Sequence, residues 1–231
     1  MKMDWFAVRS FPLFERISDA DLDAFLDQAS CRRVPQGESV FKQGEQAAHF
    51  YLLISGRLKV TQVTGDGQQV IVRVVNPGEL FGFAMALKRT DYPGTATAAI
   101  DSVALCWPSH LWPQLVEENG RLAVNAIQII GQQLEEAHTR IREMSTQEVE
   151  RRVAHAILRL SLQAGRKEES GIQIAFPISR QDIAEMTGTT LHTVSRILSA
   201  WEARDLVKCG RQKVLVRDPR GLSLLADGKR E

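Results

Sequence analysis

The sequence predicts an α+β fold, with an antiparallel β barrel or roll, then a long helix, then two short helices and a β hairpin. Three observations predict this order. Short strand patterns separated by glycine and proline turns occupy residues 33–107. Apolar residues repeat in heptads over residues 120–144. A glycine separates two short helical patterns over residues 179–206. A length of 231 residues allows one large domain or two smaller ones.

The N-terminal part is predicted to begin with an amphipathic helical segment over residues 3–29. Ser18 is the expected N-cap of a helix that carries Leu22, Phe25 and Leu26. Short strands follow, and glycine-containing turns divide them. The expected turns contain Gly37, Gly44, Ser55-Gly56, Gly65-Asp66-Gly67 and Pro77-Gly78, and the expected strands are Phe50–Ile54, Leu58–Val63, Val70–Val75 and Val103–Trp107.

A short helix over Ser109–Val116 and a long helix over Gly120–Met144 come next. The long helix repeats apolar residues at alternating steps of four and three, which is typical of a two-stranded coiled coil. We expect this stripe to be a dimer interface; the alternative is that it packs on its own domain. The stripe consists of Ala123, Ile127, Ile130, Leu134, Ala137, Ile141 and Met144.

The C-terminal part is predicted to contain a helix over Glu148–Ala164, a polar linker over Gly165–Gly171 and a strand over Ile172–Ile178. Two short helices follow. After them, Leu206–Lys208 and Val214–Arg217 are expected to form a hairpin wing around Gly210.

Capping residues define the two short helices. Ser179 and Asp182 are expected to cap the first helix, and Thr189 or Thr190 the second. Gly188 between them can adopt the left-handed backbone that ends a helix.

The second short helix has an apolar face and an exposed face. Val194, Ile197, Leu198 and Trp201 form the apolar stripe. Near the start of such a helix, a helix-turn-helix presents exposed side chains to base edges. The alternative is a helical hairpin packed inside an enzyme domain. The exposed candidates are Leu191, His192, Ser195, Arg196 and Ser199.

The net charge of +1 does not make the chain a polycation, but the charge is unevenly distributed. Residues 179–217 contain seven Lys or Arg and four Asp or Glu, a net charge of +3. Such a segment suits contact with phosphates; the alternative is an ordinary solvated surface. No apolar run is long enough for a membrane span and the start does not resemble a signal peptide, so we expect a cytoplasmic location without a membrane partner.

Enzyme and metal-site classes find no support in the motifs. The chain has no phosphate-loop motif, no nucleophile elbow and no metal-ligand spacing of His and Glu. We therefore expect no catalytic and no metal-binding residues. Cys31, Cys106 and Cys209 are widely separated and include no Cys-x-x-Cys pair, which favours reduced structural thiols.

Several motifs in order over nearly the whole chain resemble the CRP/FNR family of bacterial transcription regulators. They are Pro12-Leu13-Phe14, Gly37-Glu38-Ser39-Val40-Phe41-Lys42-Gln43-Gly44, Ser55-Gly56-Arg57-Leu58-Lys59-Val60, Pro77-Gly78-Glu79-Leu80-Phe81-Gly82 and Thr193-Val194-Ser195-Arg196. The resemblance implies a jelly-roll sensor domain similar to cyclic-nucleotide-binding domains over residues 1–117, a dimerisation helix over 118–145 and a winged helix-turn-helix over 146–231. It also implies a homodimer that acts on palindromic double-stranded DNA and on RNA polymerase.

The resemblance assigns roles in DNA contact. Arg196 is the candidate for two parallel hydrogen bonds to guanine O6 and N7. Ser195 can contact a base edge or a phosphate. His192 stands where the family usually has a glutamate that accepts from cytosine, so the preferred base at that position is open. Arg180 and Thr190 are expected to contact phosphates, which set the register without reading sequence.

The resemblance places an effector in the sensor domain. The Gly78-Glu79-Leu80 turn is similar to the turn that holds ribose and phosphate in the cyclic-nucleotide branch, although its glycines could be plain barrel turns. Residues 91–98 lack that branch's phosphate-binding Arg-Ser pair, and Ala137 and His138 replace its base-facing hydroxyl residues, so cyclic AMP is not expected. The candidate pocket residues are Gly78, Glu79, Leu80, Gly82, Thr95, Thr97 and His138.

Other cofactors are judged by the same resemblance. The oxygen-sensing branch has an N-terminal cysteine cluster, and Cys31 alone does not supply one, so no iron–sulfur cluster is expected. Residues 95–98 and the long helix look most like the cluster-free, nitric-oxide and denitrification type of regulator. Haem stays a hypothesis, with His138, His49 or His110 as ligand, although a lone histidine is more often a surface or core residue. A ligand-binding module that regulates a protein partner is the second function class, and a cyclic-nucleotide-dependent regulator is the further alternative.

Overall fold

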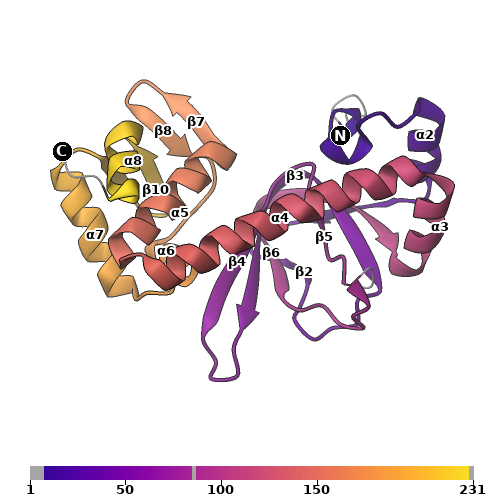
Figure 1. Ribbon diagram of the computed structural model, residues 1–231, viewed down its shortest axis with the longest axis horizontal. Helices are drawn as coiled ribbons and strands as arrows, with labels where there is room; N and C mark the ends of the chain where they lie inside the picture. Colours follow the sequence, from indigo (N-terminus) through magenta and orange to yellow (C-terminus); the bar gives the residue numbers. More distant parts are fainter. Residues whose placement is uncertain (1–7, 85–86, 229–231) are drawn as a thin grey trace. The chain divides into compact units, whose positions relative to one another are not determined.

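The structure is a computed structural model that describes residues 8–84 and 87–228 (Figure 1). These residues form two compact units. The first unit holds the chain up to Val63 together with Arg73–Ala137, and the second holds Thr64–Val72 together with the chain from His138 onward. The units divide inside the long helix, so the three-part division of the sequence stays a prediction.

The first unit contains most of an antiparallel sheet with the strand order β1-β6-β3-β4, in which β2 also pairs with β6 and β5 with β3. Residues 69–72 of β4 are grouped with the second unit. In the register of this sheet, Leu52 of β3 lies opposite Leu105 of β6 and opposite Leu80 of β5. The strands are β1 (Ser30–Val34), β2 (Ser39–Phe41), β3 (His49–Val63), β4 (Gln69–Val75), β5 (Leu80–Phe81) and β6 (Thr95–Pro108).

Two strands differ from the prediction. The expected turn at Ser55-Gly56 is wrong, because β3 continues through it as an irregular stretch where its register with β6 shifts. Gly56 has a φ of 95°, and a Cβ there would lie 2.1 Å from Ser102 Oγ, so the bulge needs glycine. The strand expected from Val103 begins at Thr95. The sequence did not indicate its first half, because the inward residues there are small alanines with little hydrophobic contrast.

Short helices cover one part of this sheet. Ser18 caps α2 (Asp19–Asp27) by accepting from the Asp21 N–H over 3.1 Å, as predicted. The expected helix after β6 is divided into a 3-10 turn, η3 (Ser109–Leu111), and α3 (Trp112–Glu118). The 3-10 turn η1 (Pro12–Phe14) precedes α2, and the start of the predicted N-terminal helix, before Val8, lies outside the described residues. The helices share a core that includes Phe14, Phe25, Phe50, Trp107 and Leu122.

The second unit combines helices with a small sheet of order β7-β8-β10-β9. The polar linker expected at Gly165–Gly171 is wrong: β7 (Gly165–Glu168) pairs with β8 (Gly171–Ile174). All four β7 residues are exposed, so the sequence has no hydrophobic alternation that would predict this strand. The strand expected to end at Ile178 ends at Ile174, where the chain leaves the sheet.

The hairpin wing consists of β9 (Val207–Gly210) and β10 (Lys213–Val216). Its turn lies at Arg211-Gln212, with a positive φ of 55° at Gln212, rather than at Gly210. The helix α8 (Pro219–Asp227) was not predicted from the sequence. Arg151 of α5 (Val149–Ala164) donates to the Ala226 carbonyl over 2.9 Å and so anchors α8. No helix in the described ranges combines the length and the hydrophobicity of a membrane span.

Candidate nucleic-acid interface

Side-chain caps hold the two short helices α6 (Arg180–Thr187) and α7 (Leu191–Ala203), as predicted. Ser179 Oγ accepts from the Asp182 N–H over 3.0 Å, and Asp182 Oδ2 accepts from the Ser179 N–H over 2.7 Å. Gly188 ends α6 with a φ of 60°. Thr190 Oγ1 then accepts from the Thr193 N–H over 3.2 Å, so Thr190 is the N-cap of α7.

Buried residues fix the rotation of α7 about its axis. Val194, Ile197, Leu198 and Trp201 are buried, as predicted. The Trp201 indole N–H also donates to Glu150 of α5 over 2.8 Å. One face of α7 is therefore held against the second unit, and the opposite face must point to solvent.

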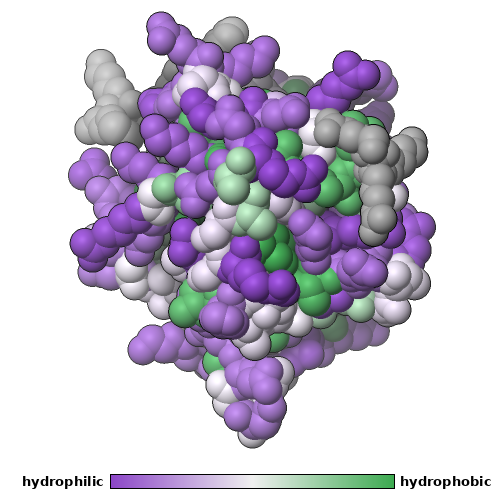
Figure 2. Space-filling view, turned by 90° about the vertical axis from the view of Figure 1, so that its left-hand side faces the viewer, coloured by the Kyte–Doolittle hydropathy of each residue, from purple (hydrophilic) through white to green (hydrophobic). Residues whose placement is uncertain are grey.

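The predicted reading residues lie together on that outward face. Leu191 is 48% exposed, and His192, Arg196 and Ser199 are exposed, while Ser195 is half-buried. Figure 2 views the molecule from the side on which α7 lies in Figure 1, and hydrophilic side chains predominate there. The arrangement supplies the donors and acceptors that base edges require.

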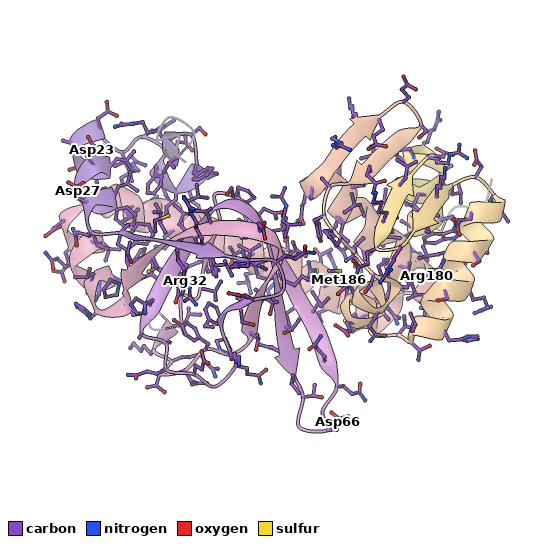
Figure 3. The ribbon with its side chains drawn as sticks, turned by 180° about the vertical axis from the view of Figure 1, so that it is seen from behind. Asp23, Asp27, Arg32, Asp66, Arg180 and Met186 are labelled. Atoms are coloured by element: carbon purple, nitrogen blue, oxygen red, sulfur yellow. The ribbon has the colours of Figure 1, made fainter. Side chains whose placement is uncertain are left out.

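A hollow of about 460 Å³ opens in the second unit between the start of α6, the helix α7 and the wing. Arg180, Arg211 and Lys213 line it, and none of its lining residues is acidic within the described part of the chain. Figure 3 labels Arg180 at the start of α6. The hollow therefore suits an anion such as a phosphate.

Arg180 was predicted from the sequence as a phosphate contact, but the positions of Arg211 and Lys213 beside it were not. The basic residues around the predicted wing were the sequence signal for this cluster. Only the structure locates the wing turn that brings them together. Arg180 itself is held loosely, because its Nη2 lies 4.0 Å from Glu202 Oε2. Cys209 also lines the hollow, and burial, reinforced by Glu202, raises the pKa of its thiol to about 11.

The long helix α4 (Gly120–Thr146) has two different apolar faces. One face is buried in the core of the first unit through Leu122, Ala126 and Ile129, and Asn125 donates to the Leu13 carbonyl over 2.9 Å. The predicted heptad stripe, called the seam below, is a separate face. Its larger members are exposed, with exposed fractions of 68% for Ile127, 37% for Ile130, 54% for Leu134, 61% for Ile141 and 50% for Met144; Ala137 is exposed and Ala123 half-buried.

The turn predicted to bind the effector already uses its hydrogen-bonding groups within the protein. The N–H of Gly78 donates to the Leu53 carbonyl over 2.8 Å, and the N–H of Glu79 donates to the Asn76 carbonyl over 3.1 Å. The Glu79 carboxylate accepts from Arg73 over 2.5 Å and from the Asn76 amide over 2.8 Å. The expected cradle of free amides for an anion is therefore absent from these two residues.

Aromatic rings fill the interior of the roll beside this turn. Phe41 stacks on Tyr92 with ring centroids 3.8 Å apart, and Tyr51 stacks on Phe81 at 5.0 Å. A Cβ on Gly82 would lie 2.8 Å from Tyr51, so the glycine lets the chain approach the rings. Leu80 is buried in the neighbouring core. Burial raises the pKa of both tyrosines.

The other pocket candidates do not join this turn. Thr95 and Thr97 alternate with the buried Ala96 and Ala98, so their hydroxyls face away from the roll interior. Thr95 Oγ1 accepts from the Gln43 N–H over 3.0 Å, and Thr97 Oγ1 lies 3.0 Å from Ser39 Oγ. His138 is exposed and belongs to the second unit.

The residues present do not fit a haem in the roll. His49 neighbours Tyr51, and the Tyr92 hydroxyl donates to the His49 carbonyl over 2.7 Å, so aromatic side chains occupy the space beside this candidate ligand. His110 and His138 are exposed. Across the described ranges, no group of three or more His, Cys, Asp or Glu side chains is arranged to hold a metal ion.

Comparison with protein families assigns both parts of the molecule. Residues 31–119 match the cyclic nucleotide-binding domain family, and residues 151–225 match the Crp-like helix-turn-helix domain family. The chain belongs to the CRP/FNR family. The match to a Crp-like helix-turn-helix favours a DNA-binding transcription regulator over a module that acts on a protein partner.

Full-length relatives agree with this assignment. The regulator is 29% identical over 221 residues to the cyclic AMP receptor protein of Thermus thermophilus, which covers 96% of this chain and 99% of that protein. It is 26% identical over 210 residues to the transcriptional activator protein FnrA of Stutzerimonas stutzeri, covering 90% and 85%. The solved structure of FixK2 from Bradyrhizobium japonicum matches with a TM-score of 0.74 and 22% identity over 85% of this chain and 96% of that one, which supports the fold.

Proposed function

We propose that this regulator binds a palindromic DNA site as a homodimer, with one α7 helix in each major groove. The outward face of α7 supports this proposal most directly. Its candidate reading side chains are exposed, apart from the half-buried Ser195, while Val194, Ile197 and Trp201 are buried behind them. Two-fold symmetry then spaces the half-site centres about 34 Å apart.

Within a half-site, Arg196 donates two parallel hydrogen bonds to a guanine. Ser195 and His192 contact neighbouring base edges, and Ser199 lies further along the same face. The apolar side chain of Leu191 can pack against a thymine methyl group. His192 brings one donor and one acceptor when neutral, so it tolerates more than one base partner.

Phosphates bind on either side of these base contacts. The hollow between α6 and the wing receives one phosphate through Arg180, Arg211 and Lys213. Thr190 Oγ1 accepts the capping bond from the Thr193 N–H and also lies 3.0 Å from Thr193 Oγ1. When the Thr193 hydroxyl donates in that pair, the Thr190 O–H can donate to a neighbouring phosphate. These contacts set the position of α7 without reading the sequence.

The seam joins two subunits in a parallel coiled coil. Its exposed Ile127, Leu134 and Ile141 repeat every seven residues along the helix, which is the spacing of the core positions of a coiled coil. A signal in the sensor shifts the equilibrium between arrangements of the two reading helices. Because aromatic rings fill the roll interior, we infer that this signal is neither cyclic AMP nor a haem held inside it. RNA polymerase is the proposed further partner. The proposed location of the regulator is the cytoplasm.

Binding to a library of palindromic duplexes tests the proposal. Selected duplexes should share one spaced palindrome, and wild type should bind it far more tightly than a scrambled duplex. Arg196→Ala should cost about 1–3 kcal/mol and relax preference at one base position, whereas Arg180→Ala should weaken all duplexes and reduce the salt slope by about 1. Arg204→Ala, at the C-terminal end of α7, is the matched control and should leave the base preference, the affinity and the salt slope unchanged. Equal affinity of wild type for cognate and scrambled duplexes would refute the proposal.

A further inference from the structure

A chain of polar contacts leads from the Glu79 turn to the helix α4 within the first unit. Arg73 donates to Glu79 through Nη2 over 2.5 Å and to Gln133 of α4 through Nη1 over 2.7 Å. Asn76 holds the other oxygen of Glu79. Arg73 and Glu79 are largely buried, with exposed side-chain fractions of 25% and 30%, so this network has a defined geometry.

Gln133 is the end of the network and has hydrogen-bonding capacity left. Its Oε1 accepts from Arg73, which fixes the orientation of the amide and leaves the two N–H groups of Nε2 to donate elsewhere. The side chain is only half-buried. Within the described residues, Gln133 Nε2 donates no hydrogen bond.

The heptad register of α4 places Gln133 beside the seam. With Ile127 and Leu134 at a positions and Ile130 and Ala137 at d positions, Gln133 occupies a g position. His138, five residues later, occupies the following e position and is exposed. In a parallel two-stranded coiled coil, a g side chain of one helix lies beside the following e side chain of the other helix.

We propose that the partner subunit's His138 accepts a hydrogen bond from the Gln133 amide and so completes the Glu79–Arg73–Gln133 network. The inference rests on the dimer of the proposed function. Within one chain, residues five positions apart on a helix do not face each other, so this contact forms only between subunits. The neutral imidazole has one nitrogen that accepts, which matches the free N–H groups of the amide. Each Glu79 turn is thereby connected to the helix of the other subunit.

Mixing two single variants tests the contact directly. A Gln133→Ala homodimer and a His138→Ala homodimer each lose both cross-subunit pairs. A mixed dimer of the two variants retains one intact pair, because one subunit still has Gln133 and the other still has His138. Native mass spectrometry of co-refolded, differently tagged full-length variants measures the ratio of the mixed dimer to the geometric mean of the two homodimers. This ratio should be about two- to fivefold above its statistical value.

Two controls separate this contact from general helix stability. Gln132 lies at an f position, away from the seam, and is exposed. A mixture of Gln132→Ala with His138→Ala should give statistical proportions. Adding Arg73→Ala to both members of the first mixture should reduce the enrichment, because Gln133 then loses the donor that orients it.

The outcomes distinguish the contact from the dimer itself. Enrichment confined to the Gln133→Ala and His138→Ala mixture supports the contact. Statistical proportions there, or equal enrichment with Gln132→Ala, overturn it while the dimer stands. Wild-type chains that remain monomeric overturn both the contact and the proposed dimer.

Discussion

Arg159 of α5 donates to Glu143, in the last turns of α4, with an Nη1–Oε1 distance of 2.6 Å. The Glu143 side chain is only 8% exposed, so the ion pair is nearly enclosed by the second unit. Loss of one partner would leave a charge with little access to water. The pair therefore stabilises the place where the long helix meets α5.

Arg159→Ala should lower the free energy of unfolding of the second unit by about 2–4 kcal/mol, because it leaves the Glu143 carboxylate unpaired. Urea denaturation followed by tryptophan fluorescence measures the loss. Arg166→Ala is the matched control, because Arg166 is 74% exposed in its pair with Glu168 and such surface pairs contribute at most about 1 kcal/mol. Equal losses in both variants would contradict a special role for the Glu143 pair.

Leu134→Glu should prevent dimerisation, because it places a carboxylate of each subunit in the apolar layer where the two seams meet. Leu134 is 54% exposed in the single chain, so the folded monomer should tolerate the change. Analytical ultracentrifugation should show a monomer with unchanged circular dichroism. Gln132→Glu, on the same helix but outside the seam, should remain dimeric; dissociation of both variants would speak against a specific interface.

Gly56→Ala should destabilise the first unit by about 2 kcal/mol or more, since the new Cβ would lie 2.1 Å from Ser102 Oγ at a φ of 95°. Gly65→Ala is the matched change in the β3–β4 turn. There a Cβ would meet no atom within 4 Å, and a small gain of about 0.4–1 kcal/mol is expected from the less flexible unfolded chain. Thermal denaturation compares the two variants, and a harmless Gly56→Ala would show that the bulge does not require glycine.

Alkylation of Cys209 should be slow at neutral pH and should accelerate up to about pH 11. Burial raises the pKa of this thiol to about 11 from an ordinary value of 9.0, and only the thiolate reacts. Iodoacetamide labelling followed by peptide mass spectrometry measures the rate, with the exposed Cys31 as an internal reference. A Cys209 rate that levels off near pH 9 would contradict the raised pKa.

The same shift predicts the effect of pH on stability. A folded pKa above the unfolded one means that the neutral thiol stabilises the fold. This contribution is complete below about pH 9 and is lost as the pH rises through about 11. In Cys209→Ser, the free energy of unfolding should therefore fall less steeply between about pH 9 and pH 11 than in wild type.

Local chemistry was enough to predict α2, α6 and α7, because their caps and apolar faces lie within a few residues of one another. Ser18, Ser179, Gly188 and Thr190 act as predicted. The outward face of α7 was predicted for the same reason, since burial of Val194 and Trp201 fixes which side chains remain exposed.

Elements defined by distant partners could not be predicted in this way. The strand β7 has no hydrophobic face, and only its pairing with β8 makes it a strand. The bulge at Gly56 depends on Ser102, which lies far along the chain. The basic hollow likewise depends on a wing turn that brings Arg211 and Lys213 beside Arg180.

Short-range periodicity and capping thus defined the helices, the heptad face and the side chains offered to a duplex, because these properties depend on neighbours in the chain. Contacts between residues far apart decided the rest. They filled the roll with Phe41, Tyr51 and Tyr92, occupied Glu79 with Arg73, and turned Thr95 and Thr97 away from the interior, since packing and cross-strand pairing depend on residues that only folding brings together.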